Sequence, residues 1–250
     1  MSEPADTTAA TNSAIVELRQ YTLHPGARET LIELFDREFV ETQEDVGMRV
    51  IGQFRELGDP NRFVWFRGFA DMPARAEGLE AFYGGPVWKK HRDAANATMI
   101  DSDDVLLLRP ARPTSGFPLA SHDRPAPGAT DIPKGIVLTT TYHLDGPADE
   151  FCDYFERALK PILIGTSAQL VAYYVSETSP NNFPALPVRE GENVFVSVSC
   201  FPDRAAFEYH RAALAQSRNW RREEKALALR VKGDPGVLKL SPTARSQLRG

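Results

Sequence analysis

One motif occurs twice along the chain, with the same internal spacing each time. Asp71 is followed 17 positions later by Trp88, and Asp203 is followed 17 positions later by Trp220. A phenylalanine stands two residues before each aspartate. Because the chain contains only three tryptophans, this coincidence indicates that one structural unit is present twice.

The first half predicts elements in the order β-α-β-β-α-β. Residues 15–23 alternate as a strand does and end at a His-Pro-Gly turn, and the next segment has apolar residues at helical spacing. A four-residue turn, Gly58 to Asn61, joins two β-rich runs into a hairpin. The predicted elements are a strand over 15–23, a helix after Pro25, strands over 48–57 and 62–69, a helical region over 73–98 interrupted at Gly84-Gly85-Pro86, and a strand over 105–108. This order is typical of a ferredoxin-like unit.

The same order returns in the second half. We expect strands over 135–144, 168–177, 193–201 and 236–240, a helix opening at Pro147, and one long helix over 203–229. Five prolines between Pro113 and Pro133 exclude a helix or a central strand there. The predicted organisation is a disordered tail over 1–14, a first unit over 15–112, a proline-rich linker over 113–133 and a second unit over 134–245.

The fold class expected for two such units is α+β. Each sheet carries helices on one face only, so the two open faces pack against each other most economically, giving an intramolecular α/β barrel with helices outside. We expect the purely apolar strand faces (Val16, Leu18, Val64 and Phe66) to lie under the helices. The mixed faces, with Glu17, Arg19, Tyr21, Trp65 and Arg67, would then point between the sheets, opposite Leu138, Thr140, Tyr142, Phe195, Ser197 and Ser199 of the second unit.

Composition excludes several classes of protein. The net charge of −5, from 29 basic and 34 acidic residues, argues against a general nucleic-acid binder. The first 14 residues lack basic residues and an apolar run, and no segment is apolar for long enough to span a membrane, so a cytoplasmic protein is expected. Cys152 and Cys200 are predicted to be reduced thiols, and no metal-binding or nucleotide-binding motif is present.

Charged and aromatic residues on the mixed strand faces are the candidate site. Arg19 and Arg67 suit an anionic group, and Trp65 and Trp88 would supply flat walls, so these four are the predicted ligand-binding residues. His91 and Tyr21 are the predicted catalytic residues, because each can exchange a proton. The structural alternatives are an ion-pair network of Glu17 with the arginines, a hydrogen-bonded core tyrosine, a tryptophan that anchors its helix and a histidine at the surface.

Two further features have open interpretations. The loop over 178–192 is much longer than the hairpin turn of the first half, and Phe183 at its tip would suit either a lid or a packing surface. His210 is a weak candidate for a haem ligand, since a lone helical histidine is usually solvated.

Three segments resemble one known family. VELRQYTLHPG near the start, FVWFRGFAD over 63–71 and AFYGGPVWKKHRDAANAT over 81–98 are similar to the NIPSNAP family, within the dimeric α/β-barrel superfamily of ferredoxin-like units. The resemblance covers roughly 15–112, while the second half follows the pattern only in outline. It implies the fold given above and leaves the activity open, because related barrels bind small ligands or act as cofactor-free monooxygenases, isomerases and cyclases or as haem-dependent enzymes.

The first functional hypothesis is a barrel that binds a small anionic or aromatic metabolite without a cofactor, with or without catalysis. The alternative is a non-catalytic protein-interaction module that uses outer helices and loops, and a haem enzyme is third. We expect no nucleic-acid partner, no membrane and no metal. The two units would form a pseudo-dimer within one chain, and a further homodimer is left open.

Overall fold

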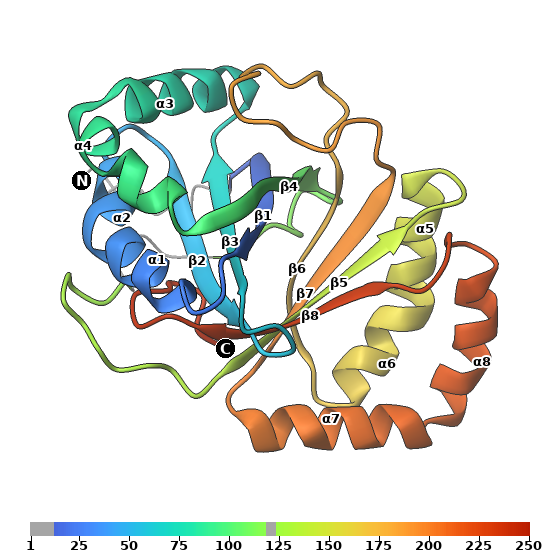
Figure 1. Ribbon diagram of the computed structural model, residues 1–250. Helices are drawn as coiled ribbons and strands as arrows, with labels where there is room; N and C mark the ends of the chain where they lie inside the picture. Colours follow the sequence, from blue (N-terminus) through green and yellow to red (C-terminus); the bar gives the residue numbers. More distant parts are fainter. Residues whose placement is uncertain (1–12, 119–123) are drawn as a thin grey trace, which may run out of the picture.

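The computed structural model describes residues 13–118 and 124–250. Nearly all of the tail expected over 1–14, and part of the linker expected over 113–133, therefore lie outside the described residues. Eight strands close into one antiparallel barrel in the order β1-β3-β2-β8-β5-β7-β6-β4 (Figure 1). The protein thus has a mixed α/β fold built on a closed barrel.

Both halves have the element order that the sequence predicts. The first comprises β1 (Ile15–Leu23), α1 (Arg28–Leu34), the π-helical turn η1 (Phe35–Phe39), α2 (Val40–Glu44), β2 (Arg49–Glu56), β3 (Arg62–Phe69), α3 (Met72–Gly84), α4 (Pro86–Asn96) and β4 (Met99–Pro110). The second comprises β5 (Ile136–His143), α5 (Ala148–Tyr154), η2 (Phe155–Leu159), α6 (Lys160–Gly165), β6 (Gln169–Ser176), β7 (Val194–Phe201), α7 (Arg204–Gln216), α8 (Arg218–Ala228) and β8 (Gly236–Pro242).

The repeated aspartate has a structural role in both halves. Asp71 caps α3 by accepting a hydrogen bond from the backbone N–H of Ala74, and Asp203 caps α7 in the same way through Ala206, each at 2.8 Å. Strand register also agrees between the halves. In the first half, Glu17 lies opposite Arg67 and Arg19 opposite Trp65 across β1 and β3. At the corresponding places of β5 and β7 in the second half, Leu138 lies opposite Ser199 and Thr140 opposite Ser197.

Two predicted boundaries are wrong. The expected single helix over 203–229 breaks at Ser217, which has extended backbone like Gly85 and caps α8 through the Trp220 N–H. Ser217 follows its capping aspartate by as many residues as Gly85 follows Asp71, so a serine replaces the Gly-Pro break. Strand β4 starts at Met99 and not at residue 105. The sequence pattern missed its first half because that half is polar, largely exposed and without apolar alternation.

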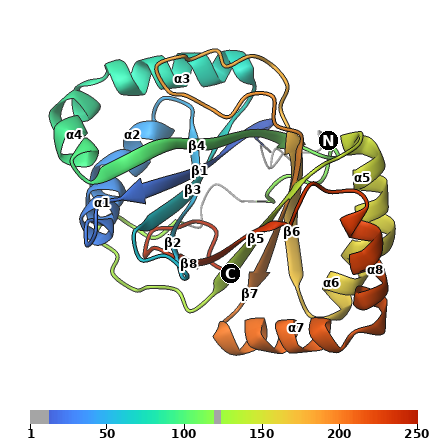
Figure 2. The same cartoon turned by 45° about the vertical axis from the view of Figure 1, so that its right-hand side comes forward.

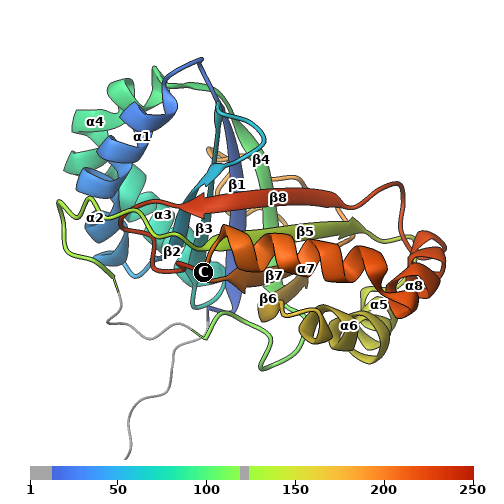
Figure 3. The ribbon, with the colours of Figure 1, turned by 90° about the horizontal axis from the view of Figure 1, so that it is seen from below.

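Helices cover the outside of the barrel in two groups. Helices α1–α4 lie on the strands of the first half and α5–α8 on those of the second (Figures 2 and 3). Pairing of β2 with β8 and of β4 with β6 joins the two sheets. Loops and the C-terminal segment contribute to the interior, where Phe117 and Leu248 join the apolar core.

The expected allocation of strand faces is wrong. Val16, Leu18 and Phe66 lie in the barrel interior with Val196 and Val198 of the opposite sheet. The mixed faces lie instead under the helices. An eight-stranded barrel is just wide enough for side chains to fill, and in this protein apolar residues fill it. Helices on the outer face bring polar partners to the buried charges. Any site built from the mixed face of the first half therefore lies between the sheet and α1–α4.

Both thiols are inaccessible. Cys152 on α5 and Cys200 on β7 are free and buried. Burial raises the pKa of Cys152 to about 11 and that of Cys200 to about 12. We expect neither to react with an aromatic disulfide reagent at pH 8 until the protein is unfolded in urea. Rapid reaction of one thiol in the folded protein would contradict this packing.

Candidate functional site

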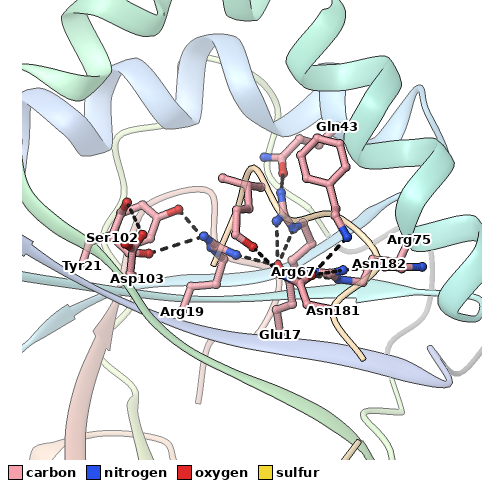
Figure 4. A network of polar contacts seen from close by, with 12 residues as sticks. Glu17, Arg19, Tyr21, Gln43, Arg67, Arg75, Ser102, Asp103, Asn181 and Asn182 are labelled. Atoms are coloured by element: carbon pink, nitrogen blue, oxygen red, sulfur yellow. Dashed lines mark hydrogen bonds and ion pairs between the residues drawn. The ribbon is translucent and has the colours of Figure 1, made fainter. Parts of the chain in front are cut away.

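Glu17 of β1 lies at the centre of a buried charge cluster. Its Oε1 accepts a hydrogen bond from Arg75 Nε at 2.7 Å. Its Oε2 accepts from Arg19 Nη1 at 2.9 Å and from Arg67 Nε and Nη2 at 3.1 and 2.6 Å (Figure 4). All four side chains are at most 1% exposed. We call Glu17, Arg19, Arg67 and Arg75 the arginine cluster.

Three elements position the arginine cluster. Glu17 and Arg19 point to the same face of β1 because they are two residues apart, and Arg67 lies opposite Glu17 on β3. Arg75 comes from the second turn of α3, on the face that also carries buried Leu79 and Phe82. A strand pair and the helix packed above it therefore converge on one carboxylate.

Uncharged groups complete the arrangement on the helix side. Arg67 Nη1 donates to Gln43 Oε1 at 3.0 Å, and Gln43 Nε2 donates to the carbonyl of Phe39 at 2.8 Å. Arg19 Nε donates to the hydroxyl of Tyr21 at 3.0 Å. Phe39 is the last residue of the π-helical turn η1, which lies over the cluster. An equivalent π-helical turn, η2, occurs in the second half, so this geometry belongs to the repeated unit.

The arginine cluster holds more positive than negative charge. Burial alone would raise the pKa of Glu17, but Arg67, Arg19 and Arg75 hold it well below its usual range. Burial lowers the pKa of Arg75, and Glu17 offsets this only in part. Burial likewise raises the pKa of Tyr21, so this phenol is neutral at pH 7. Three guanidiniums thus face one carboxylate in a region closed to solvent.

Two N–H donors beside Glu17 have no acceptor among the described residues. They are Arg75 Nη2 and Trp65 Nε1, and both are buried. The Trp65 ring lies between two guanidiniums, with Arg67 Cζ 4.9 Å and Arg19 Cζ 5.7 Å from its centre. These contacts stabilise the cations in part. They leave the two N–H groups without an acceptor in the described part of the chain.

The structure brings four of the six predicted site residues together. Arg19, Tyr21, Trp65 and Arg67 lie in or beside the arginine cluster, although under the helices rather than between the sheets. Trp88 belongs to an outer aromatic layer, where its ring contacts Phe39 and Tyr83 at 5.5 and 4.8 Å between centres.

His91 is placed apart from these residues. Its Nε2 lies 3.6 Å from a carboxylate oxygen of Glu38, and its ring lies 6.4 Å from that of Phe39. The side chain remains 16% exposed at the edge of α4. The contacts of His91 therefore run along the outer helices and not to the arginines.

Sequence reasoning missed Arg75, Gln43, Asn181 and Asn182. Arg75 gave a signal, since it stands on the helix face that carries Leu79 and Phe82, where an arginine is buried only with a partner. Gln43 gave none, because a glutamine at the end of a helix is ordinary. The two asparagines lie in a loop of the other half, and only the folded chain brings them here.

The loop over 178–192 covers the arginine cluster. It connects β6 to β7 and reaches across to α3 of the first half (Figures 1 and 2). Arg75 Nη1 donates to Asn181 Oδ1 at 3.1 Å and to Asn182 Oδ1 at 2.6 Å. Asn182 Nδ2 donates to the carbonyl of Met72 at 2.5 Å, and Phe183 stacks on Tyr83. We call this segment the cover loop.

The second half has the same arrangement without the charges. By strand register, the positions of Glu17 and Arg67 are occupied there by Leu138 and Ser199, and that of Arg19 by Thr140. Phe207 takes the position of Arg75, since each stands four residues after its capping aspartate. The chain therefore contains an uncharged version of the same layer.

His210 is buried, contrary to the solvated side chain that the sequence suggested. Its Nδ1 lies 3.0 Å from both the carbonyl and the hydroxyl oxygen of Thr166, and its ring packs on Phe201. Burial lowers its pKa. The contacts of His210 with Thr166 therefore link α7 to the end of α6.

Other surfaces carry less specific chemistry. A hollow of about 680 Å³ lies in the second half between the start of α5 and the end of α8, and no predicted site residue lines it. Within residues 13–118 and 124–250, no group of three or more His, Cys, Asp or Glu side chains is arranged to hold a metal ion. No helix in these ranges is long and apolar enough to cross a membrane.

Solved structures similar to this chain share its fold along almost its whole length. A "putative monooxygenase" from Fusobacterium nucleatum has a TM-score of 0.57 at 10% identity, covering 93% of both chains. Another from Lactobacillus acidophilus has a TM-score of 0.54 at 12% identity, covering 92% of this chain and 94% of its own. An anthrone oxidase-like protein has a TM-score of 0.55 at 16% identity, covering 95% of this chain and 98% of its own.

No curated protein matches this chain. The NIPSNAP family model matches residues 16–113, the half that carries the arginine cluster. An uncharacterized NIPSNAP domain protein from Burkholderia xenovorans, 20% identical, covers 38% of this chain and 93% of its own, with a TM-score of 0.36. The similarity to the NIPSNAP family thus lies in the first half of the chain.

Proposed function

We propose that this protein binds a small organic anion at the arginine cluster. The observation that carries the proposal is the charge imbalance of three buried guanidiniums around the single carboxylate of Glu17. A buried charge is costly unless it is paired, and a bound carboxylate or enolate would supply the missing negative charge. The free donors Arg75 Nη2 and Trp65 Nε1 would become its hydrogen-bond partners.

A purely structural role for the arginine cluster does not explain why only one half of the chain carries the charges. Buried ion pairs can specify a fold, and this is the plainest alternative for Glu17, Arg19 and Arg67. The second half, however, forms the same strand pair with Leu138 and Ser199 in place of Glu17 and Arg67. The layer therefore forms without the charges, which favours a role in binding for the half that keeps them.

The surroundings favour a ligand with a flat apolar body. Trp65, which contacts the guanidiniums of Arg19 and Arg67, packs edge to face on Phe35 at 4.8 Å between ring centres, and Phe35 packs on Phe63 at 5.5 Å. Aromatic side chains bind planar molecules through their faces, while a few polar groups fix the orientation. In this proposal the two halves are ferredoxin-like units of a dimeric α/β barrel, and the site lies under the helices of the first unit.

A second candidate function is oxidation of the bound anion by O2 without a cofactor. The names of the three structures with the same fold favour it. An activated methylene loses a proton to give an enolate, whose charge the arginines would stabilise. Oxidation of that methylene to a ketone by one O2 releases one water, so atoms and electrons balance. An oxygen electrode with anthrone as substrate tests this, and no uptake above the blank would contradict it.

Binding is tested by calorimetric titration with benzoate and with its neutral analogue benzamide. Benzoate is expected to bind and benzamide to bind at least about 10-fold more weakly, because hydrogen bonds to charged groups contribute roughly 1.5–3 kcal/mol. Arg75→Met should weaken benzoate binding by about 10- to 100-fold on the same basis. Arg211→Met, which removes an exposed arginine of α7, is the matched control. Equal affinity for benzoate and benzamide would overturn the proposal.

A further inference from the structure

We infer that Asn181 and Asn182 of the cover loop take the place of the ligand's carboxylate, and that the ligand displaces them. The inference rests on the proposed function and adds how the site is regulated. Since the arginine cluster is closed to solvent, a ligand reaches it only if something moves. The cover loop, which contacts Arg75 directly, is the segment that must move.

The contacts of Arg75 resemble those of an arginine bound to a carboxylate, except that only one of its two terminal nitrogens has acceptors in the part of the chain that the structure describes. Two side-chain oxygens, from Asn181 and Asn182, meet the single nitrogen Nη1. Nη2 is buried and has no acceptor among the described residues. A carboxylate approaching in fork geometry would use both nitrogens and bring a full negative charge. The neutral amide oxygens are therefore weaker partners that a ligand carboxylate outcompetes.

The tip of the cover loop has few buried contacts, so it can leave the arginine cluster when a ligand arrives. Every residue from 178 to 192 is at least partly exposed. The tip of the loop contacts the first half through Arg75, the Met72 carbonyl and the stack of Phe183 on Tyr83, and Leu186 packs on the first-half core. The loop is anchored on β4 near its end, where the Arg189 N–H donates to the Val105 carbonyl at 2.8 Å and Arg189 pairs with Asp104 at 3.2 Å. Gly191, near its end, has a φ of 75°, which suits a hinge. Segments with few buried contacts open at low free-energy cost.

The length of the cover loop also indicates that it does more than connect β6 to β7. In the first half five residues, 57–61, separate β2 from β3, whereas 17 residues separate β6 from β7. The extra residues extend to the other half and end on Arg75 and Tyr83. The predicted ligand is a monocarboxylate with a flat apolar body, which pairs with Arg75 as the loop withdraws and then meets the Tyr83 face that Phe183 vacates.

The test compares the full chain with Asn181→Ala/Asn182→Ala, using benzoate as the probe. Removing the competing oxygens should tighten benzoate binding by about 10-fold, since one hydrogen bond to a charged group is worth roughly that factor. Thr178→Ala, an exposed change in the same loop, is the control and should bind as the parent does. Phe183→Ala, which removes the stack on Tyr83 and the packing of the loop tip on the first-half core but leaves both asparagines, should tighten binding more modestly.

Hydrogen exchange across residues 178–192 gives a second readout. In the parent, saturating benzoate should speed exchange in the cover loop by at least about threefold while slowing it around Arg75. Unchanged or weaker binding by the double variant, or a loop whose exchange benzoate does not alter, would overturn the inference and leave anion binding intact. Absence of benzoate binding in both parent and variants would overturn the inference together with the proposed function.

Discussion

Replacing Glu17 by glutamine is expected to lower the free energy of unfolding by about 3–5 kcal/mol, because it leaves buried guanidiniums without their carboxylate. Urea unfolding at pH 7 measures this. The control is Glu208→Gln, which removes the exposed partner of Arg211 and should cost only about 0–1 kcal/mol. A loss from Glu17→Gln no larger than the control's would mean that the cluster is not electrostatically coupled. Added benzoate should restore part of the stability, because it supplies the missing negative charge.

Acid provides an independent check on Glu17. Its pKa lies far below the ordinary value of 4.5 in the folded protein, so its stabilising contribution is fully present above pH 4.5. That contribution is lost as the pH falls from 4.5 towards the folded-state pKa, where the folded carboxylate gains its proton. The parent should therefore lose stability more steeply below pH 4.5 than Glu17→Gln does. Parallel slopes for the two proteins would contradict the depressed pKa.

Phe66→Ala is expected to destabilise the protein by about 3–5 kcal/mol, the usual cost of emptying a large core position. Phe66 is completely buried inside the barrel, with its ring 6.2 Å from that of Phe54 and 5.3 Å from that of Phe117. Val237→Ala, at a half-exposed position on β8, is the control and should change stability by less than about 0.5 kcal/mol.

A small effect of Phe66→Ala would point to an interior that is loosely packed or solvated. Such an interior would fit the opposite assignment of strand faces, with a ligand between the sheets. Measuring both variants by urea unfolding therefore decides which face of the strands is the packed core.

The order of the elements was predictable because it depends on local patterns. Alternation predicted the strands, and apolar spacing with flanking prolines predicted the helices. The repeated Asp71 and Asp203, recognised in the sequence only as signs of duplication, each cap a helix, because a capping aspartate acts on the residues next to it. The helix break at Ser217 was missed because serine is a weaker boundary signal than the Gly-Pro pair after Gly84. Serine also occurs within helices, whereas proline is confined mostly to their first turn.

Which strand face lines the barrel was not predictable from alternation. Both faces of β1 carry apolar residues, such as Leu18 on one side and Tyr21 on the other, so the pattern alone does not distinguish them. The choice of inner face is made only when the barrel closes, and closure joins β2 to β8 through residues nearly 190 positions apart. Likewise, Arg19 and Arg67 were recognisable as site residues, whereas the cover-loop asparagines reach Arg75 only through the tertiary fold.

The central claim is that the arginine cluster holds an anion, and one titration tests it most directly. The variant carries the second half's residues at the four cluster positions: Glu17→Leu, Arg19→Thr, Arg67→Ser and Arg75→Phe. It should fold, as circular dichroism and urea unfolding would show, because the second half forms its layer with this set. Calorimetric titration with benzoate should show binding to the parent and at least about 100-fold weaker binding to the variant, given roughly 1.5–3 kcal/mol for each charged hydrogen bond removed. A folded variant that binds benzoate as tightly as the parent would contradict the claim.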